Sequence, residues 1–280
     1  MSGGFTAYAQ QKTTDSLTSH KAKEIFVNAG LQYISNLTYA GRREPSSVPI
    51  LLPTLTLISR HGFFLSAIGY FDLNGSKSST EGLSVTPGYV FAFDKTTRYY
   101  GGNISATKYF ITNNSPIILS AFDATIDAQL YANPKNIVKF TVGGSYRFNK
   151  NSDNNDIVNT FELSKEVYAY RPNPKKFDGL KFIPTVTLYT GTQSFYETYN
   201  MIAQNPLGVV PPTQTTTTKE VRRYDFLATS GSLQATYVIG KVQLSFTPYL
   251  IQPYNQIDYT TNTRMNGLYF LFTTGASVTF

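Results

Sequence analysis

The stretch from Leu227 to Leu250 reads LATSGSLQATYVI-GK-VQLSFTPYL and alternates between two kinds of side chain. One face of its first half carries Leu227, Thr229, Gly231, Leu233, Ala235, Tyr237 and Ile239. The other face carries mainly Ser, Thr and Gln side chains. Alternation with a period of two is typical of a strand whose two faces meet different surroundings. Gly240-Lys241 then reads as a tight turn, so the stretch predicts an antiparallel hairpin.

The same pattern recurs along the chain and predicts about twelve strands. Their centres lie near Leu31, Leu55, Ile68, Gly88, Ser105, Ala124, Gly143, Lys165, Leu188, Leu233, Phe246 and Thr274. No run of roughly 18 apolar residues is present, which excludes a membrane-spanning helix. The fold class is therefore all-β.

The connections between these strands alternate between a short and a long set. The short set is 60–62, 94–97, 132–135, 171–179 and 240–241, and the longer set is 41–47, 74–81, 112–115, 150–156, 204–223 and 256–267. In a meander, alternate connections lie at the same end, so one end has turns and the other has loops. Because this asymmetry is typical of transmembrane barrels, we expect an up-and-down antiparallel transmembrane β-barrel over residues 24–280.

Composition supports a barrel over a soluble β-sandwich, which is the alternative fold. Only 15% of the 280 residues are charged, against about a quarter in ordinary domains. The polar faces carry mostly Ser, Thr, Gly, Gln and Asn, whereas the solvent face of a sandwich would carry many Lys and Glu. The net charge of +7 is scattered, so a nucleic-acid partner is not expected. The absence of cysteine excludes disulfides and thiol chemistry.

The last stretch, Leu268 to Phe280, places Phe270, Phe272, Ala276, Val278 and Phe280 on one face. This segment resembles the C-terminal assembly signal of Gram-negative outer-membrane β-barrel proteins, which is a final strand that ends in Phe. The resemblance implies an outer-membrane location with both termini in the periplasm. It also implies the barrel-assembly machinery as a partner. A barrel in this membrane is expected to contact membrane lipid and lipopolysaccharide, and other outer-membrane proteins are partners in the alternative in which the barrel is an accessory subunit.

Residues 1–23 precede the first expected strand and form an N-terminal leader and periplasmic segment. Ala7-Tyr8-Ala9 matches the small-residue pattern of a signal-peptidase site, but a positive start and an apolar stretch are missing before it. Two interpretations stay open: the remnant of a secretion signal, or an ordinary small-residue leader.

Six charged side chains fall on the polar faces of three consecutive expected strands: Asp123, Asp127, Lys139, Arg147, Glu162 and Glu166. Counting outward from a turn at 132–135 places Lys139 near Asp127 and Arg147 near Asp123. A similar alignment brings Glu166 toward Lys139 and Glu162 toward Arg147. Because buried charges need partners, these residues form either a structural ion network that fills the lumen or a charged constriction that sets ion selectivity.

An enzyme is not expected, because a barrel hydrolase would need a Ser–His pair and only His20 and His61 are present. Two distant histidines also argue against a metal site, and no cofactor is expected. Arg42 and Arg43 in the first long loop would either meet lipopolysaccharide phosphates or be solvated. The sequence thus predicts a narrow, porin-like diffusion channel for small solutes. The alternative is a non-conducting accessory barrel subunit of a larger outer-membrane complex.

Overall fold

The computed structural model describes residues 24–43, 47–74, 79–94, 96–112, 115–150, 155–172, 178–194, 224–258 and 263–280. Within these ranges, twelve long strands form one closed barrel. They are β1 (Ile25–Ile34), β4 (Ile50–Ser59), β5 (Phe63–Asp72), β6 (Ser79–Ala92), β7 (Tyr100–Ile111), β8 (Phe122–Ala132), β9 (Lys139–Asn149), β10 (Asp156–Ser164), β12 (Gly179–Gly191), β13 (Asp225–Ile239), β14 (Val242–Pro253) and β17 (Tyr269–Thr279).

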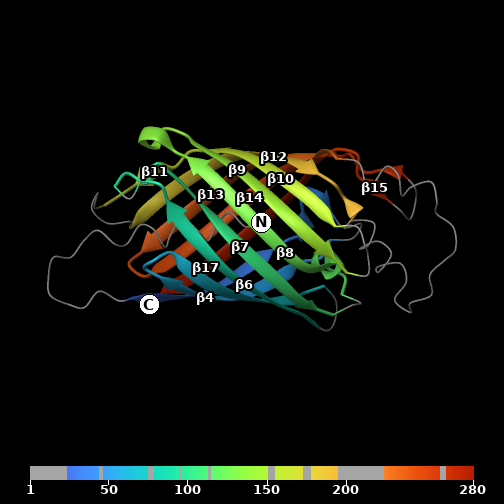
Figure 1. The fold of residues 1–280 in the computed structure, drawn as a ribbon, viewed down its shortest axis with the longest axis horizontal. Helices are drawn as coiled ribbons and strands as arrows, with labels where there is room; N and C mark the ends of the chain where they lie inside the picture. Colours follow the sequence, from blue (N-terminus) through green and yellow to red (C-terminus); the bar gives the residue numbers. More distant parts are fainter. Residues whose placement is uncertain are drawn as a thin grey trace.

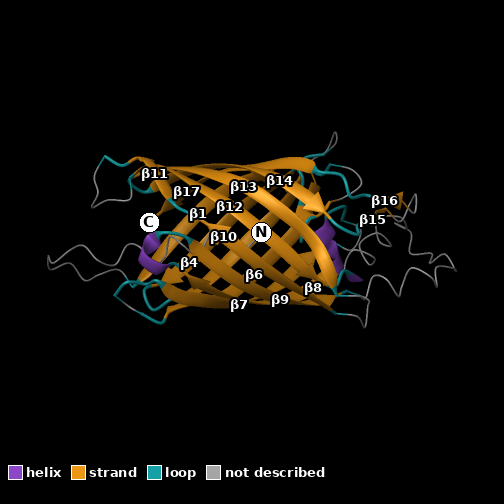
Figure 2. Cartoon of the chain, turned by 90° about the horizontal axis from the view of Figure 1, so that it is seen from above, coloured by secondary structure: helices purple, strands orange, loops and turns teal. Residues whose placement is uncertain are grey.

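Each long strand pairs antiparallel with the next, and β1 pairs with β17 to close the ring (Figures 1 and 2). The closing register sets Asn28 opposite Thr279 and Ile34 opposite Thr273. The short strand β11 (Val167–Tyr170) pairs with β12 and continues the line of β10 after a break at residues 165–166. The predicted fold class is confirmed, and every expected strand is present, although the expected centre Lys165 falls in that break.

The two ends of the barrel differ as the sequence predicts. The start of β1 and the end of β17 lie at the short-turn end. There the amide of Arg60 donates to the carbonyl of Glu24 (3.0 Å). The amide of Thr279 donates to the carbonyl of Lys241 in another short turn (3.0 Å). This end also carries the 3₁₀ turn η2 (Pro134–Asn136). The opposite, loop end carries two small hairpins, β2–β3 (Thr38–Tyr39 and Arg42–Arg43) and β15–β16 (Ile257–Asp258 and Thr263–Arg264), and the 3₁₀ helix η1 (Ile118–Ala121) (Figure 2). None of the helices in the described ranges is long and apolar enough to span a membrane.

Apolar side chains cover the outer wall, because alternate residues of every strand point away from the lumen. Phe63, Val186 and Phe270 are each about 60% exposed, at 63%, 61% and 59%. A water-soluble protein rarely exposes a continuous apolar belt of this size, since removing apolar surface from water drives folding. Phe270, Phe272, Ala276, Val278 and Phe280 all lie on this outer face of the last strand or at its end.

One expected face is wrong where a β-bulge interrupts the alternation. The register between β12 and β13 shifts at Tyr189/Thr190, opposite the start of β13. A bulge inserts one residue and so turns the following side chains to the opposite face. Leu227 is therefore completely buried inside the barrel, while its neighbour Phe226 is exposed outside. The rest of the expected apolar face of β13, such as Leu233 and Ile239, does point outward.

Candidate functional site

The first long connection folds into the barrel instead of extending from it. Residues 35–49 join β1 to β4, and their centre is the β2–β3 hairpin. Its two turn residues, Ala40 and Gly41, both have positive φ values of 49° and 73°. A two-residue hairpin turn of type I′ needs this left-handed backbone at both positions, which explains the glycine. We call the described residues of this connection, 35–43 and 47–49, the plug.

The tip of the plug crosses the mouth and contacts strands on other parts of the wall. The hydroxyl of Tyr269, on β17, donates to the carbonyl of Gly41 (3.1 Å). The guanidinium of Arg42 donates to the carbonyl of Leu227 on β13 (2.7 Å) and to the amide oxygen of Gln193 (2.9 Å). Gly41 also lies directly against Ala228 of β13.

Tyr39 reaches the opposite side of the barrel. Its hydroxyl accepts a hydrogen bond from the Arg147 side chain on β9, and its ring packs edge-on against Phe122 of β8, with centroids 4.9 Å apart. The Arg147 guanidinium also lies 4.7 Å from the centre of the Tyr39 ring, a cation–π distance. Because β9 lies six strands away from β1 in the ring of twelve, the described part of the plug spans the mouth from wall to wall.

An apolar core holds the plug in place at the loop end. Its plug members include Leu37, Tyr39, Ala40 and Val48, and each is at least nine-tenths buried. From the wall and from η1, the core adds Ile34, Ile50, Leu52, Tyr70, Ile111, Ile117, Ile118, Ala121, Phe122, Val158 and Leu227. Burying such side chains stabilises a contact by about 1.5–3 kcal/mol for each large one. The plug is therefore a packed part of the barrel.

Packing of the plug corrects one expectation about lipopolysaccharide. Arg42 is 0% exposed, so it is neither a solvated loop charge nor available to lipid phosphates. The side chain of Arg43 lies outside the described residues. Sequence reasoning missed the plug because it treated 41–47 as a polar loop. The available signal was the Ala40-Gly41 turn flanked by the apolar residues Leu37, Tyr39 and Val48.

Asp127 and Arg147 form an ion pair on the inner wall, but not in the predicted combination. Arg147 Nη2 lies 3.0 Å from Asp127 Oδ1, and both side chains are largely buried. Asp127 also accepts hydrogen bonds from Ser145 and Thr125. The expectation that Lys139 lies beside Asp127 is wrong. The turn between β8 and β9 spans 133–138 and contains η2, so Asp127 faces Ser145 in the register.

Asp123 does not join the inner cluster, which corrects a second expectation. A register shift between Phe122 and Ala124 marks a bulge at the start of β8. The Asp123 carboxylate pairs with Lys108 Nζ (2.6 Å), whose neighbours on the same face of β7, Ile104 and Phe110, are exposed on the outer wall. Asp123 therefore belongs to the outer rim.

Lys139, Glu162 and Glu166 all lie near the short-turn end. Lys139 faces Ser164 in the register, and Glu162 points inward two residues away, so Glu162 neighbours Lys139 instead of the expected Arg147. Glu166 forms its ion pair with Lys181 (3.0 Å) and still lies close enough to Lys139 for its charge to act on it. In the described ranges, neither Lys139 nor Glu162 forms an ion pair. Lys139 lies over the Tyr131 ring, 5.0 Å from its centre.

The inner wall between the plug and the short turns is polar and reachable by solvent. Asn28, Ser66, Ser105, Gln129 and Glu162 all point inward and keep intermediate exposure. In contrast, the residues around the plug are buried. The inner wall of the short-turn half is thus accessible to solvent, and the described plug residues pack across the loop half.

His61 takes no part in this site. His61 lies in the exposed turn between β4 and β5, where its ring nitrogen accepts a hydrogen bond from Arg60 (3.3 Å). His20 lies outside the described residues.

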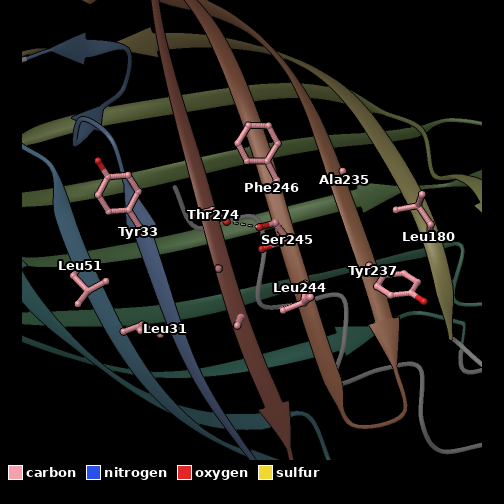
Figure 3. A pocket seen from close by; sticks show the side chains of 12 residues that line it. Leu31, Tyr33, Leu51, Leu180, Ala235, Tyr237, Leu244, Ser245, Phe246 and Thr274 are labelled. Atoms are coloured by element: carbon pink, nitrogen blue, oxygen red, sulfur yellow. Dashed lines mark hydrogen bonds between the residues drawn. The ribbon is translucent and has the colours of Figure 1, made fainter.

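A shallow groove of about 540 Å³ lies on the outer wall and is not part of the lumen. Figure 3 shows Leu31, Leu244 and Phe246 around it, all on outward faces of their strands. The hydroxyl of Thr274, in its floor, donates to the carbonyl of Ser245 (3.1 Å), so this outward hydroxyl has a partner. Such pairing is what a hydrocarbon environment requires.

A closed antiparallel barrel with an apolar outer wall and a polar lumen defines the class of this protein: it is a transmembrane β-barrel. No family model matches the chain, and a search of curated proteins finds no match. Among solved structures, the chain is similar to a KdgM porin (8% identity, 91% of this chain and 99% of that chain covered, TM-score 0.47). It is also similar to the COG4313 outer membrane channel from Pseudomonas putida F1 (10% identity, 91% and 94% covered, TM-score 0.44). A third is an anion-selective porin from Comamonas acidovorans (8% identity, 91% and 98% covered, TM-score 0.32).

Proposed function

We propose that the protein is a narrow outer-membrane channel for small solutes and that the plug closes its loop mouth. The observation that carries this proposal is the contrast within the lumen. Its short-turn half has a polar, solvent-reachable wall, whereas in its loop half the described plug residues pack with η1 and the wall into a buried core. In this proposal the loop end faces outside and both termini face the periplasm, as in outer-membrane barrels generally.

The register allows the plug to be removed cleanly, which gives a direct test. Ile34 and Ile50 are paired neighbours on β1 and β4, so a turn of a few Gly and Ser residues can replace residues 36–48 without stretching either strand. The measurement is single-channel conductance in a planar bilayer. The wild-type protein should rest mostly closed, and the shortened variant should show discrete open steps.

A separate gel experiment checks that the shortened variant is folded. Transmembrane barrels resist unfolding in detergent until heated, so a heat-dependent gel shift confirms that the shortened variant is folded. A folded variant without conductance would refute the channel and favour the accessory barrel. That second function is supported by one observation, the dense packing of the plug.

Lumenal charges should then decide ion selectivity. Glu162 and Lys139 point into the wet half of the lumen without an ion pair among the described residues, whereas Asp127 is neutralised by Arg147. Rings of charged side chains set selectivity in pores. In the plug-deleted channel, Glu162→Gln should shift the reversal potential under a salt gradient toward anion preference, and Lys139→Gln should shift it toward cation preference. Asp123→Asn, on the outer rim, is the matched control and should leave it unchanged.

A further inference from the structure

Three charged side chains gather on the outer wall at the loop end of β7, β8 and β9, where hydrocarbon would make isolated charges costly. Lys108 Nζ and Asp123 Oδ1 lie 2.6 Å apart, and the two side chains are 48% and 50% exposed. Lys150 directly follows β9, and its ammonium donates to the carbonyl of Ile111 at the end of β7 (2.9 Å). It lies close enough to Asp123 and Lys108 for both charges to act on it. We call Lys108, Asp123 and Lys150 the rim cluster.

Local backbone structure explains why the cluster forms. The bulge at the start of β8 turns the Asp123 side chain away from the lumen toward Lys108. The amide of Lys150 donates to the carbonyl of Ala121 (2.7 Å), which ties the end of β9 to η1. Residues from three adjacent strands are thereby held on one patch of the wall.

Aromatic side chains give the depth of the rim cluster in the membrane. Phe110 is 57% exposed two residues beyond Lys108 on the same face. On β9, Tyr146 and Phe148 pack edge-to-face with centroids 5.0 Å apart. The register sets Lys108, Ala124 and Phe148 at one height. Because aromatic girdles of transmembrane barrels lie at the membrane–water interface, the rim cluster is at the level of the lipid headgroups.

Charge and depth together identify the occupant. Two ammonium groups face one carboxylate, so the cluster carries a net charge of +1 at a depth where headgroup phosphates lie. We propose that Lys108 and Lys150 bind a phosphate group of an anionic lipid of the lipid A type, in the leaflet at the loop end. Without a bound lipid, the Asp123 carboxylate pairs with Lys108. When a phosphate is bound, the same carboxylate repels it. Charge-assisted hydrogen bonds from ammonium groups to phosphate oxygens are short and strong.

Binding can be followed by energy transfer, because the chain contains no tryptophan. In a Phe110→Trp background, the single tryptophan sits beside the cluster and acts as donor. The probe is dansyl-labelled diphosphoryl lipid A, titrated as a mole fraction of phosphatidylcholine vesicles that contain the folded protein. Lys108→Ala and Lys150→Ala should each raise the half-saturating fraction about fivefold, since a basic side chain near a membrane surface contributes on this scale.

Asp123→Asn distinguishes phosphate binding from a structural role of the ion pair. It removes the repelling carboxylate, so the half-saturating fraction should fall. If the pair only braced the barrel, this variant would bind no better than the wild type. Lys108→Arg keeps the charge and should retain binding. Lys241→Ala, an exposed lysine in a turn at the other end, is the control and should have no effect.

Two outcomes would overturn the proposal. One is an unchanged titration in the folded Lys108→Ala/Lys150→Ala protein. The other is equal transfer from labelled lipid A that has lost its phosphates, which would mean that acyl chains alone bring the lipid to the wall. These titrations do not depend on conductance, so they test the rim site independently of the proposed channel.

Discussion

Adding a single methyl group at Gly41 tests whether the protein is the proposed channel closed by the plug. A Cβ built on Gly41 would lie 2.0 Å from the Cβ of Ala228, well inside van der Waals contact, and Gly41 has a φ of +73°. An L residue in this left-handed region costs about 1 kcal/mol or more. Forcing extra atoms into a packed contact costs about 1–3 kcal/mol. Gly41→Ala should therefore weaken the closed state by at least about 2 kcal/mol, or about thirtyfold in the ratio of closed to open channels.

The assay is open probability in a planar bilayer, recorded beside two matched variants. Gly240→Ala adds a methyl group at a similar φ of +57° but with no atom within 4 Å, so it should leave the open probability unchanged. Ala228→Gly removes the opposing Cβ, so the double variant Gly41→Ala/Ala228→Gly should regain the part of the closed population that the clash removes, while the backbone cost of about 1 kcal/mol remains. A folded Gly41→Ala protein that stays as closed as the wild type would refute the role of this contact. An open probability of the double variant equal to that of Gly41→Ala would also refute it.

Three further predictions concern stability and assembly. Arg147→Met leaves the Asp127 carboxylate unpaired and should lower the free energy of unfolding by about 3–5 kcal/mol, measured by urea titration in lipid vesicles. Phe280→Ala should reduce the fraction of heat-modifiable barrel in the outer membrane, if the terminal strand is the assembly signal; unchanged insertion would exclude that role. The hydroxyl and amide of Thr97 lower the pKa of Asp94 in its exposed turn, so this turn is stabilised above the ordinary carboxyl pKa and loses that stabilisation as pH falls through the lowered value. Hydrogen exchange of the turn should show this loss, and Asp94→Asn should abolish the pH dependence.

Part of the charged site could be predicted from the sequence, and the missing part has a physical cause. The inward direction of Asp127, Arg147 and Glu162 follows from alternation alone, and the structure has it so. Which of these side chains form pairs depends on the register between neighbouring strands. A turn of unexpected length shifts that register along the whole strand. The 3₁₀ turn at 134–136 lengthens the β8–β9 connection, so Arg147 meets Asp127 and leaves Lys139 beside Glu162.

β-Bulges made two of the expected side-chain directions wrong. Asp123 and Leu227 each follow the expected alternation in the sequence, yet a register shift near the start of their strands turns Asp123 outward and Leu227 inward. A bulge adds a residue without a distinctive side chain, so a single sequence gives little sign of it.

The sequence by itself determined the barrel: the strand count, the apolar outer face and the two unequal ends follow from local alternation and from loop lengths. These features need no knowledge of distant contacts, because each strand must satisfy its backbone against its neighbours and its outer face against lipid. Only the tertiary structure decided that the described part of the first loop turns inward and packs across the mouth. That choice depends on contacts of Tyr39 with β9 and of Gly41 with β13 and β17, which join residues more than a hundred positions apart. No local pattern in residues 35–49 encodes the shape of the walls that receive them.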